Sequence, residues 1–258
     1  MSDRRVGCLL VADLDGEAAV ELQVAAAGLP REEELVVELD HRPVDVVEHA
    51  TAVGGRLHLL RAGPGRLAVR YSAVVGPAEP VPVEPLDAAL FLRPSRYAES
   101  DRLAAVAAAE WGSHPAGMEL VRAVATWVGA RTVYEPGSST VTDGAVDTLL
   151  AGEGVCRDFA HLVVGLLRAR DVPARVVSAY APGLSPMDFH AVAEVLVDGA
   201  WRLVDATRLA PRQSLVRIAT GRDAADTAFL SSHGAGLRLD TVEVTAVVDG
   251  ALPLDDHR

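Results

Sequence analysis

The sequence predicts an α+β protein in which a β-rich module is followed by helices packed against an antiparallel sheet. Three observations predict this class. Short Val/Leu-rich runs fill the first 85 residues, helical periodicity begins near Glu99, and strand-like runs return after residue 173. The chain has 258 residues, half of them hydrophobic, so it can bury a sizeable core. A disordered or low-complexity protein is therefore excluded.

Turn signals containing Gly and Pro separate the expected strands of the first module. These strands are 18–24, 33–39, 56–60 and 67–75. A connector with four prolines in ten residues, 76–85, follows them and is typical of an extended linker. We therefore expect an N-terminal β-rich domain over residues 1–85 and a second domain, with C-terminal β-strands, over residues 86–258.

Four helices are expected after this connector. The segment 103–110 is rich in alanine, and apolar residues recur at three- and four-residue spacing over 118–128. Thr142-Asp143 is placed to cap a short third helix. The fourth helix should span about 155–170, before Asp171-Val172-Pro173. Its apolar stripe is Phe159, Leu162, Val163, Leu166 and Leu167.

Strand-like runs follow the last helix. They are 174–180, 191–197, 201–204, 215–219 and 237–248. Asp198-Gly199 separates the second run from the third, and this dipeptide between two such runs is a strong hairpin signal. The two strands of this hairpin should therefore lie side by side in an antiparallel sheet.

The charge of the chain disfavours some partners. The formal net charge is −12, all 24 basic residues are arginine, and no basic stripe interrupts the acidity. We therefore expect neither a nucleic-acid nor an anionic-membrane partner. No apolar stretch approaches the ~18 residues that a membrane span needs. The absence of lysine and asparagine indicates a GC-rich bacterial genome.

Cysteine usage predicts a reducing compartment. Cys8 and Cys156 are the only cysteines, too few for a disulfide framework. The apolar run 6–12 is at the lower limit for a signal peptide and lacks a small-residue cleavage site. These features favour a cytoplasmic protein. We interpret Cys8 as a small buried hydrophobic residue.

Cys156 is the candidate nucleophile. It opens the expected fourth helix, near the positive end of the helix dipole, which favours a thiolate. His190 lies at the start of a strand that can pair with the sheet beneath this helix. Asp205 ends the next strand, across the Asp198-Gly199 hairpin, so it should lie at the same end of the sheet as His190. A thiol, an imidazole and an orienting carboxylate are the groups that covalent catalysis requires.

Three segments of this chain resemble the catalytic blocks of the bacterial transglutaminase-like superfamily. They are Gly154-Val155-Cys156-Arg157-Asp158-Phe159-Ala160-His161-Leu162, Asp188-Phe189-His190-Ala191 and Trp201-Arg202-Leu203-Val204-Asp205-Ala206-Thr207. The resemblance implies a papain-like core with an N-terminal β domain and a triad of Cys156, His190 and Asp205. Two residues depart from the usual pattern: Val192 replaces a common tryptophan, and Ala206 replaces a proline. Both changes concern the shape of the substrate cleft and leave the triad intact.

The expected activity is thiol-dependent acyl transfer or hydrolysis at amide or carboxamide bonds, through a thioester on Cys156. The substrate would be a peptide or protein with glutamine or other amide groups. Whether an amine or water accepts the acyl group stays open, so a cysteine peptidase or amidase is an alternative to a transferase. A non-catalytic binding module that retains the fold is the second hypothesis. The presence of all three catalytic residue types argues against it.

Other candidate residues have simpler interpretations. His161 lies about 140° around the helix from Cys156, which predicts a structural role and excludes a shared metal site with Cys156 and His190. We therefore expect no metal and no cofactor. Asp158 should cap the helix of Cys156. Gly221-Arg222-Asp223-Ala224-Ala225-Asp226 resembles a further block found in one bacterial group. Two interpretations are open, that Arg222 and Asp223 line the cleft or that they pair with each other, and we favour pairing.

Overall fold

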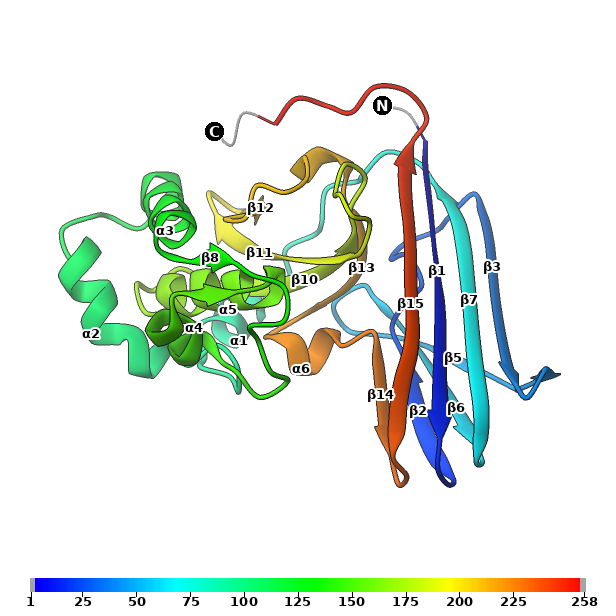
Figure 1. The fold of residues 1–258 in the computed structure, drawn as a ribbon. Helices are drawn as coiled ribbons and strands as arrows, with labels where there is room; N and C mark the ends of the chain where they lie inside the picture. Colours follow the sequence, from blue (N-terminus) through cyan, green and yellow to red (C-terminus); the bar gives the residue numbers. More distant parts are fainter. Residues whose placement is uncertain (1–2, 256–258) are drawn as a thin grey trace.

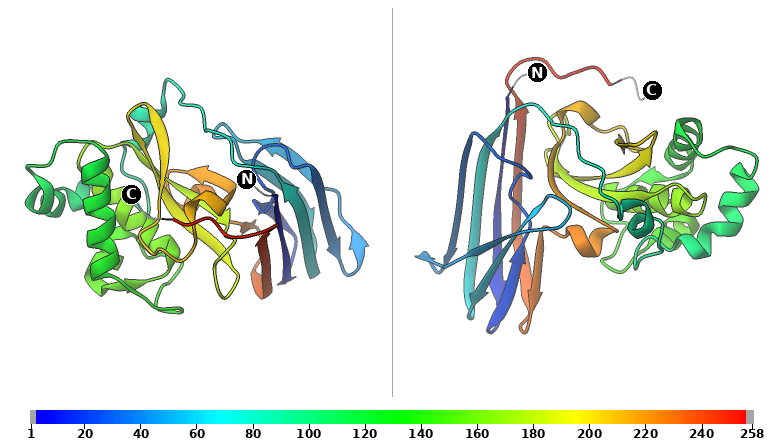
Figure 2. Two further views of the ribbon diagram at one scale, coloured as in Figure 1. Left: turned by 90° about the horizontal axis from the view of Figure 1, so that it is seen from above. Right: turned by 180° about the vertical axis from the view of Figure 1, so that it is seen from behind.

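The structure, a computed structural model, describes residues 3–255 and confirms the α+β class. It has three layers: a pair of sheets built mainly from the first 75 residues, a separate four-stranded sheet formed by residues 174–221, and a group of helices (Figures 1 and 2). The four-stranded sheet lies between the paired sheets and the helices (Figure 1). This arrangement places the sheet strands against the helix that carries Cys156.

Two antiparallel sheets form the β module. The first has the order β15-β1-β7-β3-β4 and the second the order β14-β2-β6-β5. Their strands are β1 (Arg4–Leu14), β2 (Ala18–Leu22), β3 (Glu32–Leu39), β4 (Arg42–Pro43), β5 (Val47–Ala50), β6 (Arg56–Ala62), β7 (Gly65–Val75), β14 (Leu230–His233) and β15 (Leu237–Val248). The four strands expected for this module are thus confirmed, and two long strands, β1 and β15, and the short strands β4, β5 and β14 accompany them.

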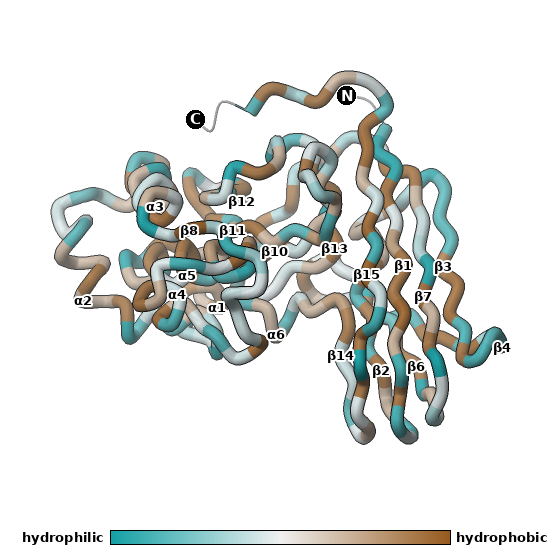
Figure 3. The backbone as a smooth tube through the Cα atoms, viewed as in Figure 1, coloured by the Kyte–Doolittle hydropathy of each residue, from teal (hydrophilic) through white to brown (hydrophobic). Residues whose placement is uncertain are grey.

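Alternation of buried and exposed residues explains why these runs form strands. In β7 the residues Leu67, Val69, Tyr71 and Ala73 are buried, and their neighbours in sequence point the other way. Along β15 hydrophobic and hydrophilic residues alternate, as the hydropathy colours of Figure 3 show. The inward-facing side chains of both sheets form one hydrophobic cluster.

The last two strands return to the beginning of the chain. β15 pairs antiparallel with β1 along its whole length, and β14 pairs with β2. Both strands lie within residues 86–258, the range expected to form the second domain. Their hydrogen bonds nevertheless join them to the strands of the first module. The reason is that β1 has only β7 on one side, and β15 satisfies the backbone groups of its other edge.

The second part of the chain holds the helices and the middle sheet. The helices are α1 (Asp87–Phe91), α2 (Ser100–Trp111), α3 (Met118–Arg131), α4 (Ala145–Ala151), α5 (Cys156–Arg168) and α6 (Ala224–Thr227), with a 3₁₀ turn, η1 (Arg212–Ser214). The sheet has the antiparallel order β12-β11-β10-β13. Its strands are β10 (Ala174–Tyr180), β11 (Phe189–Val197), β12 (Ala200–Val204) and β13 (Val216–Gly221), and a parallel pair, β8 (Val133–Tyr134) and β9 (Glu153–Gly154), precedes α5.

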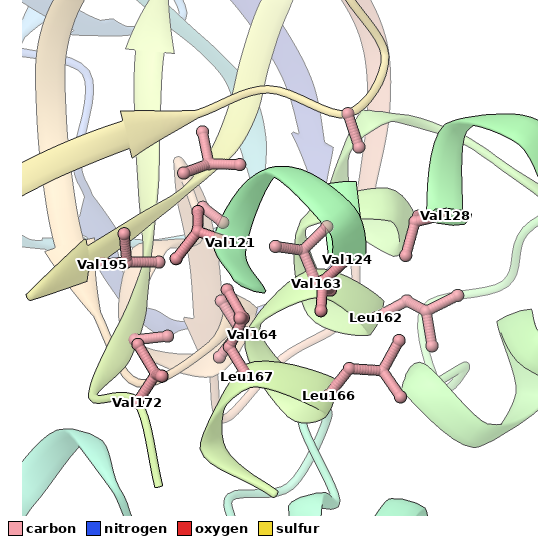
Figure 4. Packing of buried hydrophobic residues seen from close by; sticks show 14 of the residues in the cluster. Val121, Val124, Val128, Leu162, Val163, Val164, Leu166, Leu167, Val172 and Val195 are labelled. Carbon is pink, nitrogen blue, oxygen red and sulfur yellow. The ribbon is translucent and has the colours of Figure 1, made fainter. Parts of the chain in front are cut away.

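Helix α5 is the centre of this second part. It packs against α2, α3 and α4 on one side and against β10 and β11 on the other. Leu162, Val163, Leu166 and Leu167 have at most 1% of their surface exposed, and they meet Val124 of α3 and Val195 of β11 (Figure 4). The apolar stripe expected from the sequence is therefore buried, and α5 cannot rotate without exposing it.

The hairpin between β11 and β12 also forms as expected. Val197 pairs with Ala200, and both Asp198 and Gly199 have positive φ, 53° and 70°. Such a two-residue turn matches the twist of the strands it joins, and Asp and Gly tolerate this conformation. The turn fixes the register that carries His190 and Asp205.

One expected helix start is wrong. The first residue of α4 is Ala145, with Gly144 as its cap, and the Gly144 N–H donates to Asp147 at 2.9 Å. The Ala145 N–H donates to Glu99 at 2.9 Å. Asp143 instead accepts the hydroxyl and the N–H of Thr140 in the preceding turn. The carboxylate of Glu99, the residue before α2, thus replaces the local cap that the sequence suggests.

Within residues 3–255, no helix is both long enough and apolar enough to cross a membrane.

Truncation of the α5 stripe should destabilise the whole molecule. Leu166 is 0% exposed, so Leu166→Ala should lower the free energy of unfolding by about 2–5 kcal/mol, the range for buried leucines. Leu150 on α4 is 80% exposed, and Leu150→Ala should change it by less than about 0.5 kcal/mol. Urea unfolding of both variants followed by circular dichroism measures the difference. Equal losses would contradict the central place of α5.

Candidate active site

Cys156 is the first residue of α5 and is partly exposed. The backbone of Val155 is extended, and its N–H donates to the Asp158 carboxylate at 2.8 Å. Asp158 is 1% exposed and closes the first turn, which confirms its expected capping role. A Cβ on Gly154 would lie 2.7 Å from that of Asp158, so only glycine fits before this turn. These contacts fix where the helix begins and hence where the thiol lies.

His190 is the second residue of β11, and it pairs with Ala179 of β10. Its side chain is completely buried. The imidazole Nε2 lies 2.8 Å from Oδ2 of Asp205, at hydrogen-bond distance. The backbone pairing of β11 with β10 sets the position of this ring, while the pairing of β11 with β12 begins further along the strand, at Ala193.

Asp205 directly follows β12, and its carboxylate is as buried as the imidazole. Oδ2 faces His190, while Oδ1 accepts the N–H of Thr207 at 2.9 Å and its hydroxyl at 2.6 Å. Three donors therefore satisfy this buried carboxylate. The residue that follows, Ala206, lies in the hydrophobic cluster under α3.

The electrostatics of the pair favour a charged imidazole. Burial alone would lower the pKa of His190, but the hydrogen bond to Asp205 and the contact with Cys156 outweigh it and raise that pKa to about 10. Burial alone would raise the pKa of Asp205, whereas the hydrogen bonds from His190 and Thr207 hold it below its usual value. The pair is thus an imidazolium and a carboxylate at neutral pH.

The other ring nitrogen of His190, Nδ1, is buried and has no hydrogen-bond partner among residues 3–255. The Cys156 side chain is one of the groups that raise the pKa of His190. The structure therefore brings together the three residues selected from the sequence, in the order Cys156, His190, Asp205. This is the geometry of a nucleophile, a base and an orienting acid.

A fourth residue at this site, Tyr134, was not found from the sequence. It lies in β8, which pairs with β9 directly before Cys156, and its ring lies 6.1 Å from that of Phe159. Cys156 is one of the groups that shift the pKa of Tyr134, so the two side chains lie close together. Burial raises its pKa to about 12, and the nearby Cys156 and Asp188 add to this rise, so the hydroxyl is protonated and can donate.

No strong signal in the sequence marks Tyr134. β8 and β9 have two residues each, so neither shows the alternation from which strands are predicted. The only hint in the sequence is that an aromatic residue, Tyr134, lies in the segment before the cysteine block, and that hint is weak by itself.

His161 is structural, as expected. It is completely buried, its ring stacks on Tyr97 with 5.5 Å between the centres, and Nε2 accepts the N–H of Ala224 at 3.0 Å. Burial lowers its pKa to about 4, so it is neutral. It therefore anchors the start of α6 to α5 rather than joining the chemistry at Cys156.

The expected pairing of Arg222 with Asp223 is wrong. Arg222 lies before α6 and binds the carboxylate of Asp226 in that helix through Nε and Nη2, at 2.9 and 3.0 Å, and through its backbone N–H at 2.9 Å. Asp223 is instead buried and accepts the N–H groups of Tyr97 and Ala225, each at 2.9 Å. Asp223 thus holds the start of α6 next to Tyr97, which lies just before α2.

No group of three or more His, Cys, Asp or Glu side chains among residues 3–255 is arranged to hold a metal ion. The reactive groups described above are all supplied by the chain itself.

Comparisons with known proteins agree with this geometry. The family model of the transglutaminase-like superfamily matches residues 104–206, which include Cys156, His190 and Asp205. A solved structure, a candidate cysteine protease from Cytophaga hutchinsonii, is 32% identical, covers 98% of this chain and 93% of its own, and superposes with a TM-score of 0.89.

Two curated relatives match over shorter stretches. An uncharacterised protein of Mycobacterium leprae is 28% identical over 170 residues, which are 61% of this chain and 59% of that protein. An uncharacterised protein of Mycobacterium tuberculosis is 41% identical over 63 residues, 24% of this chain and 20% of its own length. The chain thus matches only part of these longer relatives. The family model, the extended structural match and the Cys-His-Asp geometry together show that the chain belongs to the transglutaminase-like superfamily.

Proposed function

We propose that the protein is a thiol-dependent enzyme that cleaves amide or carboxamide bonds through a thioester on Cys156. One observation carries the proposal: a buried imidazole bonded to Asp205 presents its other ring nitrogen to a thiol at a helix start. The substrate would be a peptide or protein with glutamine or other amide groups. The complete set of bonded catalytic groups argues against a binding module that only retains the fold.

The acylation step uses the imidazolium of His190. The Cys156 sulfur, as thiolate, attacks the amide carbonyl and forms a C–S bond. The imidazolium gives its Nδ1 proton to the departing nitrogen as the C–N bond breaks, and an amine or ammonia leaves. Asp205 keeps Nε2 protonated and holds the ring plane, so that Nδ1 continues to face the sulfur.

The deacylation step reverses the proton transfer. The neutral His190 takes a proton from the acceptor, the acceptor attacks the thioester carbonyl, and the C–S bond breaks to return the thiolate. We propose water as the main acceptor, supported by the likeness to a candidate cysteine protease over nearly the whole chain. A primary amine is the alternative acceptor, and it would make the enzyme a transferase.

Two donors would stabilise the oxyanion that forms at the carbonyl. The Cys156 N–H at the start of α5 is one of them, and we propose the Tyr134 hydroxyl as the other because it lies close to Cys156. Tyr134 is 37% exposed, so its hydroxyl has room to give way to the substrate oxygen and then donate to it.

The proposed setting is a reducing one. Both cysteines are free, and a disulfide would remove the nucleophile, so we propose a cytoplasmic enzyme that acts on protein or peptide substrates. The net charge of −12 supports partners other than nucleic acids and anionic membranes.

The decisive experiment for the function is mass spectrometry of amide and peptide libraries incubated with the protein, with and without a primary amine. Cys156→Ala should abolish all product formation, because no other group at the site can form the thioester. The matched variant Cys8→Ala should keep near wild-type activity. A dead Cys8 variant together with an active Cys156 variant would overturn the proposal.

The two cysteines should differ in their reaction with iodoacetamide. Cys156 contacts a charged imidazole, and it should be alkylated within minutes at pH 6. Burial raises the pKa of Cys8 to about 11, so Cys8 should stay unmodified in the folded protein. Peptide mapping by mass spectrometry reads out both sites in one sample. Faster labelling of Cys8 would contradict the proposed thiol–imidazolium pair.

Loss of the Tyr134 hydroxyl should slow the chemistry without weakening binding. Tyr134→Phe keeps the ring against Phe159 and should lower kcat and kcat/KM together by about 100-fold, as the loss of one oxyanion donor does. Tyr97→Phe is the control, because that hydroxyl donates to the Val141 carbonyl outside the triad. Unchanged kcat in Tyr134→Phe would remove this residue from the mechanism.

The composition allows a test of the acceptor. The chain has two glutamines and no lysine, and protonated arginine is a poor acyl acceptor, so the pure enzyme cannot form glutamine–lysine cross-links with itself. It should remain one band on a reducing denaturing gel. A lysine-rich protein with accessible glutamines should be cleaved or deamidated if water is the acceptor, and should form ladders if an amine is. Reductant-resistant ladders of the enzyme alone would require a different bond chemistry.

A further inference from the structure

A hollow of about 340 Å³ lies between α3 and the segment that follows β12. Apolar side chains from both sides line part of it, among them Met118, Val121 and Val204. It meets the catalytic centre at one residue, because Asp205 lines the hollow while Cys156 and His190 do not. The hollow is therefore separate from the place where the thiol attacks, although it touches the carboxylate that orients His190.

Three arginines line this hollow in a protein whose net charge is −12. They are Arg122 of α3, Arg208 of the segment after β12, and Arg212 of η1. Most arginines elsewhere on the surface bind a carboxylate, as Arg66 and Arg70 do. Arg122 and Arg208 are exposed and have no ion pair or hydrogen-bond partner among residues 3–255. Two guanidinium groups are thus available beside an apolar wall.

The third arginine shows which chemistry this site accepts. Arg212 binds the carboxylate of Asp255 through its backbone N–H, Nε and Nη2, at 2.9, 2.8 and 2.7 Å. The segment that carries Asp255 runs from β15 back across the second part of the chain (Figure 1). A carboxylate of the chain itself is therefore already seated at one rim of the hollow.

The Asp205 carboxylate does not neutralise the two available arginines. Its oxygens already accept hydrogen bonds from His190 and from the N–H and hydroxyl of Thr207. The carboxylate is therefore engaged by these donors, and the guanidinium groups of Arg122 and Arg208 stay available to an incoming anion.

The backbone at Arg208 supports a specific placement of its side chain. Its φ is +57°, a left-handed conformation that an arginine rarely adopts. The cost of this conformation has to be met by the surrounding structure, and such residues occur in turns and at ligand or reaction sites. Here the residue in this conformation is one of those that line the hollow.

We propose that this hollow is a binding site for an organic carboxylate, with the carboxylate held by Arg122 and Arg208 and its apolar body against Met118, Val121 and Val204. Binding itself does not depend on the proposed function, whereas any effect on the rate rests on it. The carboxylate belongs either to the substrate of Cys156 or to a separate effector, and the chemistry of recognition is the same for both.

Binding of 4-phenylbutyrate, followed by isothermal titration and ligand-observed NMR, tests the site. The wild-type protein should bind the acid, and 4-phenylbutyramide should bind at least about tenfold more weakly, because it lacks the charge. The double variant Arg122→Gln/Arg208→Gln should lose about tenfold or more in affinity for the acid. Arg42→Gln/Arg61→Gln removes the same charge from exposed positions of the β module and should bind as the wild type does.

Three results would overturn the proposal: no binding of the acid to the wild-type protein, equal binding of acid and amide, or equal loss in both double variants. None of them bears on whether Cys156 is a nucleophile, since binding is measured without turnover. Conversely, an inactive protein that binds the acid through Arg122 and Arg208 would refute the proposed function and retain the site.

Kinetics with an active substrate identify the source of the carboxylate. If the anion belongs to the substrate, Arg122→Gln/Arg208→Gln should raise KM about tenfold for a peptide with a free carboxylate and leave KM of its amidated twin unchanged. If it is an effector, free 4-phenylbutyrate should change the rate with the amidated peptide. Binding with neither effect would overturn the link between the hollow and the catalytic centre.

Discussion

Burial of α5 is the constraint on which the rest of the molecule depends. Three helices and two strands cover this helix, and the turn formed by Gly154, Val155 and Asp158 fixes its first residue. Since each residue advances a helix by about 100°, a start displaced by one position would turn Cys156 away from β11. Packing deep in the core therefore decides whether a thiol at its edge meets an imidazole.

The hydrogen bond between His190 and Asp205 serves to orient the imidazole ring rather than to stabilise the fold. Removing two charges from water is costly, and a buried ion pair often contributes little to folding. Here β11 and β12 hold both groups in register, and Thr207 satisfies the second carboxylate oxygen. The pair fixes which ring nitrogen carries a proton towards Asp205, and so leaves the other for the thiol.

The sequence allowed the fold class, the helix α5, the hairpin and the meeting of the three triad residues to be predicted, because each depends on a local signal: a period, a turn dipeptide or a helix start. What could not be predicted depends on contacts between distant segments. Tyr134 reaches Cys156 through a two-residue strand pair, α4 takes its cap from Glu99, and Asp223 is bound by Tyr97. Arg222 was expected to pair with Asp223, its neighbour in sequence. The fold instead brings the carboxylate of Asp226 to Arg222.

The pairing of β15 with β1 has a consequence for the order in which the molecule is made. Arg5 and Asp249, at one end of this pair, are 244 positions apart in the chain. During synthesis β1 emerges before β15, and its outer edge stays without a partner until β15 has also left the ribosome. The contacts of α5 with α4, β10 and β11 are far more local, so α5 and the strands beside it can assemble while the β module is still open. The edge of β1 is therefore closed only after the segments between the two strands have been made.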